Sequence, residues 1–282
     1  MKFEQVETGF GAIEAPRIAD DGTRYFTDIQ QQPALYQRTT DGALRKFLDG
    51  RINIGGIVFN QDGRLICSGR GGLVLLDPNS GAVEPLLTEI DGKPIDVIND
   101  IQTDAAGSVY GGTLDYTALS EHRPAAKGVL FRLDPDRTLT VLNREVGISN
   151  GIGFSPDRTR LYHSDTGAGV WVYDLHADRS VSNRRLFVEL HGSDGMCVDA
   201  EGHVWAACYA TREIIRFTPD GAVERRYGFD EPAVLSVVFG GPDLRDLYVA
   251  TADDWADPGH GRGRIYRARS EIAGQPLPKA RF

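Results

Sequence analysis

Short hydrophobic runs bounded by turn-forming residues recur along the whole chain. They are rich in β-branched and aromatic residues, and four of them are Gly72–Leu76, Gly128–Leu133, Gly169–Tyr173 and Glu213–Phe217. This composition and length favour β-strands. Asp-Pro pairs follow two of the runs directly, at Asp77-Pro78 and Asp134-Pro135, and such pairs mark turns. No stretch shows sustained helical periodicity, so the pattern predicts an all-β fold.

The strand-forming runs belong to a repeat of six units. The matching positions that open each unit are Glu14-Ala15-Pro16, Gly55-Gly56-Ile57, Asn99-Asp100-Ile101, Asn150-Gly151-Ile152, Asp194-Gly195-Met196 and Leu235-Ser236-Val237. Their spacings are 41, 44, 51, 44 and 41 residues. Each opening leads to a turn and then to a strand. A period near 40 residues indicates one structural unit repeated along the chain.

Four short strands per unit, repeated six times, are typical of a six-bladed β-propeller, in which radial closure protects the sheet edges. A horseshoe-shaped solenoid is the alternative, but leucine-rich and helical repeats have other internal patterns. We expect one domain over residues 1–282, because single repeats cannot bury their own faces. Phe3–Val6 is expected beside Gly263–Arg267 to close the ring. The insertion Asp115–Lys127, which lengthens the third spacing, is expected to lie over one face.

Composition and charge narrow the class of protein. The chain has 282 residues, of which 41% are hydrophobic and 25% charged, as in globular proteins. Its net charge is −9 without long runs of like charge, so we expect no nucleic-acid partner.

Neither a membrane partner nor export is expected. Charged residues interrupt Met1–Glu7, where a signal peptide needs an apolar stretch. No apolar run approaches the roughly 18 residues that a membrane-spanning helix requires. The three cysteines, Cys67, Cys197 and Cys208, are odd in number and scattered through expected strands, as is usual for buried thiols in a reducing compartment. We therefore expect a cytoplasmic protein; its oligomeric state is left open.

Four of the six openings begin with a polar residue: Glu14, Asn99, Asn150 and Asp194. The innermost strand of each blade lines the central channel of a propeller, so these side chains are expected to converge on its axis. Two carboxylates and two amides offer only hard oxygen ligands, which suit Ca²⁺, Mg²⁺ or Mn²⁺. The alternative is that Asn and Asp precede Gly here because they favour turns.

Specific motifs point to a known family. They are Ser149–Ser155 (Ser-Asn-Gly-Ile-Gly-Phe-Ser), Ser193–Asp199 (Ser-Asp-Gly-Met-Cys-Val-Asp), Val204–Tyr209 (Val-Trp-Ala-Ala-Cys-Tyr) and Asn99-Asp100. With these, nearly the whole chain resembles the senescence marker protein, regucalcin and gluconolactonase family. The resemblance implies a six-bladed propeller that holds one divalent cation through a Glu, an Asn and an Asp, here Glu14, Asn150 and Asp194. It also implies that Asn99 contacts bound water or substrate near the metal, and that the activity is metal-dependent lactone hydrolysis.

The chain departs from the family pattern at two positions. Sugar-lactone members usually carry Arg where this chain has Val97, and an acidic residue where the nearest match is Thr117. The opening Ile13-Glu14-Ala15-Pro16 also differs from the usual motif, although the Glu is present. Arg and carboxylate groups bind hydroxyls, so we expect a substrate less polar than an aldonolactone.

The sequence therefore predicts a metal-dependent hydrolase that opens a small lactone or ester. Asp194 is the expected general base as well as a ligand, and Asn99 is expected to position the substrate carbonyl or the attacking water. Ca²⁺ is the first expectation for the ion, with Mg²⁺, Mn²⁺, Zn²⁺ and Fe²⁺ as alternatives. Two other functions stay open: a phosphotriesterase resembling diisopropyl fluorophosphatase, and a non-enzymatic calcium-binding propeller.

Overall fold

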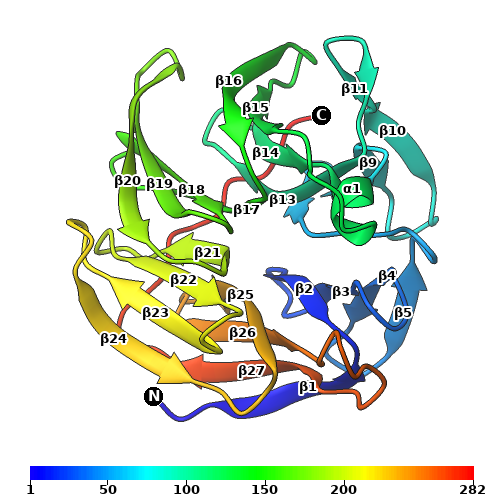
Figure 1. The fold of residues 1–282 in the computed structure, drawn as a ribbon. Coiled ribbons are helices and arrows are strands. Elements are labelled where there is room, and N and C mark those ends of the chain that lie inside the picture. The colour runs from blue at the N-terminus through cyan, green and yellow to red at the C-terminus, as the bar shows by residue number, and fades with distance from the viewer.

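The chain folds as a ring of six four-stranded antiparallel sheets around a central channel (Figure 1). The computed structural model describes all residues, 1–282. Blades 1 to 3 comprise β2 (Ile13–Ile18), β3 (Arg24–Asp28), β4 (Ala34–Arg38) and β5 (Leu44–Phe47); β6 (Ile57–Phe59), β7 (Leu65–Cys67), β9 (Leu73–Leu76) and β10 (Val83–Leu87); and β13 (Val97–Thr103), β14 (Val109–Leu114), β15 (Gly128–Leu133) and β16 (Leu139–Val146). The strand β8 (Gly69–Arg70) adds to β13, and β11 (Glu89–Ile90) pairs with β12 (Lys93–Pro94).

Blades 4 to 6 complete the ring. They comprise β17 (Ser149–Phe154), β18 (Arg160–Asp165), β19 (Gly169–Leu175) and β20 (Val181–Glu189); β21 (Ser193–Val198), β22 (Val204–Cys208), β23 (Glu213–Phe217) and β24 (Val223–Gly228); and β25 (Ala233–Gly240), β26 (Asp246–Ala252), β27 (Gly263–Arg269) and β1 (Glu4–Phe10). The predicted six-bladed propeller is confirmed.

The ring closes because the N-terminal strand completes the last blade, which the C-terminal part of the chain forms. The N-terminal strand β1 pairs antiparallel with β27, with Glu4 opposite Arg267 and Gln5 opposite Tyr266. The predicted closure is therefore confirmed. Phe10, at the end of β1, then packs edge-on against Phe26 and Tyr36 of blade 1, with ring centroids 5.0 Å apart in both pairs.

The hydrophobic core lies between the blades. Six clusters of buried side chains each draw residues from two neighbouring blades, so together they go once around the ring. One example packs Tyr162 and Val170 of blade 4 against Met196 and Val204 of blade 5. Each blade thus depends on its neighbours for burial of its apolar faces, as the repeat predicted.

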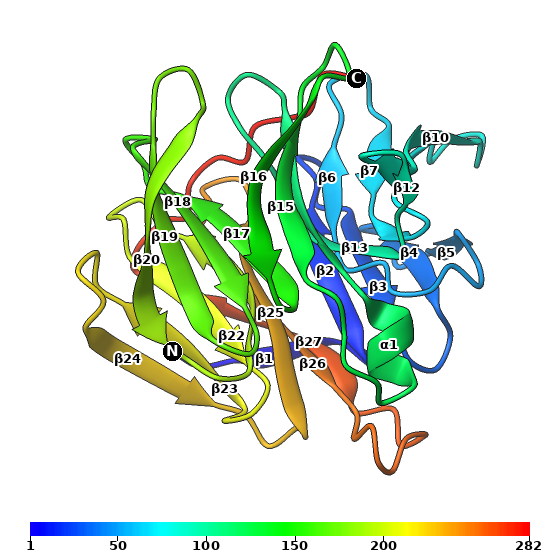
Figure 2. The same cartoon turned by 45° about the horizontal axis from the view of Figure 1, so that its top comes forward.

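The insertion contains one helix that the sequence pattern did not predict. This helix, α1 (Tyr116–Ser120), has five residues and begins after Asp115, whose side chain accepts a hydrogen bond from the Ala118 amide. Figure 2 shows α1 and the β26–β27 loop at one end of the ring, and the C-terminal segment at the opposite end. No helix in the structure is long and apolar enough to cross a membrane.

Candidate functional site

The four polar opening residues lie at the starts of the innermost strands: Glu14 on β2, Asn99 on β13, Asn150 on β17 and Asp194 on β21. In each of these blades the pairing register with the second strand shifts at the opening residue or immediately beside it. Such bulges bend a strand and redirect a side chain. The same irregularity in four blades thus turns the four polar side chains toward the channel.

Hydrogen bonds connect the amide side chains of neighbouring blades. Asn99 Nδ2 donates to the Ser149 carbonyl at 2.9 Å and to Asn150 Oδ1 at 3.1 Å. Asn150 Nδ2 donates to Thr166 Oγ1 at 3.0 Å. Since both hydrogens of the Asn99 amide are used within the channel wall, its Oδ1 is the atom left to face a ligand. Its one partner is Asn53 Nδ2, at 3.4 Å.

The carboxylates of the site are buried close to one another. Glu14 and Asp194 are each 6% exposed, and Asp100, beside Asn99, is 7% exposed. Burial raises the pKa of Glu14 well above its usual range, and the charges of Asp194 and Asp100 raise it further. Burial and then Asp100 raise the pKa of Asp194 in the same direction. Burial raises the pKa of Asp100 to about 7. The cluster therefore holds more negative charge than its surroundings stabilise.

The one basic residue beside this cluster is Arg17, which is 7% exposed and lies farther along β2. Its guanidinium donates to the Pro16 carbonyl at 2.9 Å and to the Ile101 carbonyl at 3.4 Å, whereas Nε has no partner. Burial lowers the pKa of Arg17 from its usual value, and the charge of Asp100 opposes this shift by favouring the protonated form. Arg17 therefore offsets part of the negative charge of the three carboxylates.

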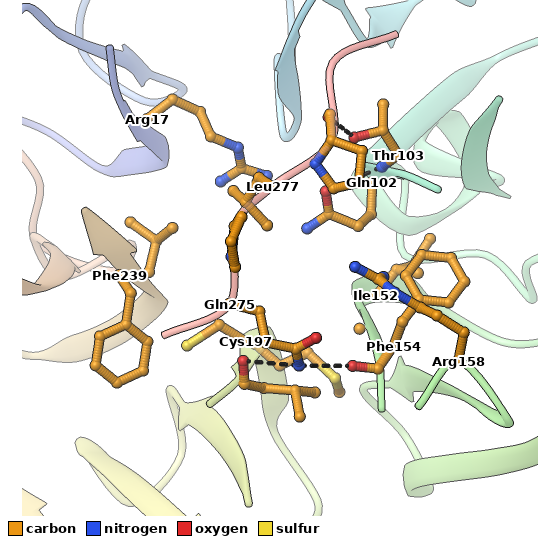
Figure 3. A pocket seen from close by; sticks show the side chains of 16 residues that line it. Arg17, Gln102, Thr103, Ile152, Phe154, Arg158, Cys197, Phe239, Gln275 and Leu277 are labelled. Atoms are coloured by element: carbon orange, nitrogen blue, oxygen red, sulfur yellow. Dashed lines mark hydrogen bonds between the residues drawn. The ribbon is translucent and has the colours of Figure 1, made fainter. Parts of the chain in front are cut away.

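Arg17 also lines a small cavity of about 40 Å³ at the far end of the channel. Figure 3 shows side chains from several blades around this cavity, with Gln275 and Leu277 of the C-terminal segment crossing it. Gln275 Nε2 donates to the carbonyls of Phe154 and Val198, at 2.9 and 3.2 Å. The C-terminal segment therefore covers the channel at the ends of the innermost strands, opposite the four opening residues.

At the other mouth, the insertion is tied to the start of β13. Thr117 donates from its amide and its hydroxyl to the two carboxylate oxygens of Asp96, at 2.7 and 3.1 Å. Val97 is fully buried and pairs with Arg70 of β8. The guanidinium of Arg70 lies 5.5 Å from the Tyr116 ring centroid and 3.6 Å from Asp96. Thr117 therefore holds α1 in place rather than replacing a substrate-binding acid.

The carboxylate and amide oxygens of the site are suited to binding a cation. Asp194 Oδ1 is buried without any hydrogen-bond partner, and a buried polar atom without a partner is costly. The structure contains no group of three or more His, Cys, Asp or Glu side chains arranged to hold a metal ion. Carboxylates alone would therefore not form a ligand set here, and a cation at this place would also need an amide oxygen such as Asn150 Oδ1.

Glycines beside the site residues serve packing rather than turns. Gly151 and Gly195 do not adopt the positive φ that turn glycines need. A Cβ on Gly151 would lie 2.5 Å from the Met196 amide nitrogen, and one on Gly195 would lie 2.7 Å from Ser236 Oγ. The residues Asn150 and Asp194 therefore precede Gly because neighbouring blades approach closely there, which answers the alternative based on turn preference.

Other polar residues support the backbone around the site. Asp28 accepts from the Gly11 and Ala12 amides, and Asp165 accepts in the same way from Gly147 and Ile148. His163 is buried, and its Nε2 lies 2.8 Å from Ser149 Oγ.

Sequence reasoning did not identify Asp100, Arg17 or Thr166 as part of the site. Asp100 stands beside a predicted residue, and Arg17 follows the Glu14 motif, so proximity in sequence was an available signal. Thr166 lies in the turn after β18, and no sequence signal distinguishes it.

The fold and the site together define the class of protein. It is a six-bladed propeller with oxygen-bearing side chains at one mouth of its channel. Within this class, the chain belongs to the SMP-30/gluconolactonase/LRE-like family, whose model matches residues 13–253.

Relatives and solved structures agree with this assignment. The pentonolactonase XacC of Haloferax volcanii is 40% identical over 172 residues, which span 58% of this chain and 56% of that protein. The 6-deoxy-6-sulfogluconolactonase of Pseudomonas putida is 32% identical over 223 residues, 77% of this chain and 71% of the relative. The structure of regucalcin, a calcium-binding protein from Agrobacterium tumefaciens, superposes with a TM-score of 0.85 at 23% identity, covering 99% and 98% of the two chains.

Proposed function

We propose that the protein is a lactonase that depends on one divalent cation bound by Glu14, Asn150 and Asp194. The observation that carries the proposal is the convergence of two buried carboxylates and an oriented amide, with Asp194 Oδ1 left without a partner. The two lactonase relatives support the reaction class, and the calcium-binding neighbour supports a divalent ion, with Ca²⁺ first. We expect ligand distances of roughly 2.0 to 2.6 Å.

The chain's own residues supply the proton transfers. A cation at this site would polarise the lactone carbonyl and acidify a water molecule. Asp194 accepts the proton of the attacking water as the water oxygen bonds to the carbonyl carbon, since a carboxylate beside the attacking water can act as its general base. The ring C–O bond then breaks, and Asp194 returns the proton to the alkoxide that leaves. The product is one hydroxy acid.

Asn99 takes a more restricted role than the sequence suggested. Its two amide hydrogens are engaged by Ser149 and Asn150, so it has no free donor for the substrate carbonyl. Its Oδ1 accepts from Asn53 at 3.4 Å and has a second lone pair that can accept from the attacking water or from a substrate hydroxyl. We therefore assign Asn99 to orientation of the water.

The mouth of the site favours a substrate with few hydroxyls. Tyr209 is 43% exposed and lies near enough to Asp194 for its pKa to be raised, first by partial burial and then by that carboxylate. With Val97 buried and Thr117 bonded to Asp96, we infer a small lactone less polar than an aldonolactone.

Location and partners follow from the same features. Cys67, Cys197 and Cys208 are all free thiols, which fits a reducing compartment, and we place the protein in the cytoplasm. The partner we propose is a small-molecule lactone or ester; the net charge of −9 argues against nucleic acid.

A substrate panel tests the function. Metal-stripped protein is resupplied in turn with Ca²⁺, Mg²⁺, Mn²⁺, Zn²⁺ or Fe²⁺ and assayed on γ- and δ-lactones, linear esters and a phosphotriester. The proposal expects turnover of lactones above linear esters. Preference for the phosphotriester would reassign the enzyme. Metal binding that raises thermal stability without turnover of any substrate would indicate a structural or calcium-buffering ion.

A further inference from the structure

Five polar groups at the channel mouth form a single chain of hydrogen bonds. Asn53 Nδ2 donates to Asn99 Oδ1 at 3.4 Å, and Asn99 Nδ2 donates to Asn150 Oδ1 at 3.1 Å. Asn150 Nδ2 then donates to Thr166 Oγ1 at 3.0 Å, and the Thr166 hydroxyl donates to the Ser193 carbonyl at 2.9 Å. This series of hydrogen bonds runs from the loop before blade 2, across blades 3 and 4, to the residue that precedes Asp194.

The donor and acceptor roles in this series of hydrogen bonds are fixed by its last acceptor, the Ser193 carbonyl. A backbone carbonyl has no hydrogen, so the Thr166 hydroxyl has to donate to Ser193. Its lone pairs are then available only as acceptors, and the group that reaches them from Asn150 has to be the NH₂. The oxygen of the Asn150 amide is therefore turned away from Thr166. The hydroxyl of Thr166 thus distinguishes the oxygen of the Asn150 amide from its nitrogen, which the positions of heavy atoms alone leave ambiguous.

The orientation of Asn150 decides whether it can bind a cation. An amide oxygen is a metal ligand, whereas an NH₂ group presents hydrogens that repel a cation. Thr166 and Asn150 are both 7% exposed and Ser193 is fully buried, so water has little access to replace a missing partner. Without the Thr166 hydroxyl, nothing in the wall accepts from Asn150 Nδ2, and the hydrogen bond from Asn99 is the one contact left to orient the amide.

We propose that Thr166 is a positioning residue for the cation site. It holds the Asn150 amide with its oxygen toward the ion, and it couples this orientation to the Asp194 backbone through Ser193. The inference rests on the proposed metal site and goes beyond it, because Thr166 lies in the turn immediately after β18 and is not a ligand.

The experiment measures the affinity for Ca²⁺ and Mn²⁺ by competition with a fluorescent chelator. Thr166→Val keeps the shape of the side chain and removes the hydroxyl, and it should weaken affinity about 10- to 100-fold, as is usual for groups that orient metal ligands. Thr166→Ser restores the hydroxyl and should stay within about threefold of the parent protein. Thr251→Val is the matched control: Thr251 is fully buried and bonded to Arg262 and Arg264 in blade 6, so affinity should not change.

A double-mutant cycle separates orientation from general stability. Asp at position 150 presents oxygen from either side, so in an Asn150→Asp background the Thr166→Val change should weaken affinity much less. Equal weakening in both backgrounds would overturn the proposal and leave Thr166 with a structural role only. If Thr166→Val does not fold, Thr166→Ala tests the same prediction.

The two hypotheses fail in different ways. If the parent protein binds neither ion, the proposed metal site is wrong. If the parent protein binds an ion and Thr166→Val binds it equally well, the metal site stands and the role of Thr166 is wrong.

Discussion

Asp194 has two roles in the proposed reaction, ligand and proton acceptor, and one substitution separates them. Asp194→Asn keeps an oxygen of similar shape and removes the charge and the basicity. Metal affinity should weaken, and turnover at saturating metal should fall by about 10² to 10⁴, as is typical for loss of a general base. The measurement is kcat of the variant as a function of metal concentration. Recovery of nearly full kcat at high metal would leave Asp194 as a ligand only.

His163 makes stability depend on pH. Burial is the main cause that lowers its pKa to about 4, compared with about 6.5 in an unfolded chain. Between these values the unfolded chain binds a proton that the folded chain does not, so stability falls as pH falls through this window. From pH 7 to pH 5 the His163 contribution to the free energy of unfolding should decrease by about 2 kcal/mol.

The check is urea denaturation of metal-free protein at both pH values, alongside His163→Gln. The acids of raised pKa contribute in the opposite direction, because their protonated forms favour the fold, but they are present in both proteins. The difference between the two proteins therefore isolates His163. An identical pH dependence of parent and variant would show that His163 does not titrate in this way.

Strand β13 and the insertion that follows β14 set the expectation for substrate choice. Val97 is buried, and Thr117 is bonded to Asp96, so neither supplies a group for sugar hydroxyls. We expect kcat/KM for gluconolactone to be at least 10-fold below that for a lactone with fewer hydroxyls. A site that lacks hydrogen-bonding partners for the sugar hydroxyls gains no binding energy from them. A clear preference for gluconolactone would show that other side chains bind the hydroxyls, with Arg70 and Tyr116 the nearest candidates.

The closing strand β1 contributes to stability through Phe10. This ring contacts Phe26 and Tyr36 of blade 1, although β1 itself belongs to blade 6. Phe10→Ala should lower the free energy of unfolding by about 3 kcal/mol, the range seen for buried aromatic truncations. Urea denaturation measures the effect. Val223→Ala, on the exposed outer strand β24, is the control and should change stability by less than about 0.5 kcal/mol; equal effects would contradict the proposed role of Phe10.

For the strands and loops, the sequence predicts the features that recur in every repeat. It does not predict features that depend on contacts between distant residues. The spacing of the six openings predicts the six blades, and the strand signals beside Phe3 and Gly263 predict the closure. The bulges that turn Glu14 and Asn150 inward are not visible in any residue pattern, although the equivalence of the positions is. The crossing of Gln275 under the channel depends on carbonyls more than 70 residues away, and no periodicity records it.

For the molecule as a whole, the propeller gives the site two unlike ends. One end carries α1, and the other is covered by the C-terminal segment (Figures 2 and 3). The opening residues lie at the starts of the innermost strands, away from the C-terminal segment. The buried carboxylates Glu14, Asp100 and Asp194 gather where six blades meet, so the free energy that buries them comes from closure of the entire ring.

The central claim is that a divalent cation in this channel is required for lactone hydrolysis. The most direct measurement is the initial rate of lactone opening by metal-stripped protein as Ca²⁺ or Mn²⁺ is added in known equivalents. We predict no turnover above background before addition, then a rise that saturates at one ion per chain, with Glu14→Gln needing much more metal. Full turnover in the stripped protein, or no turnover at any concentration of either ion, would contradict the account.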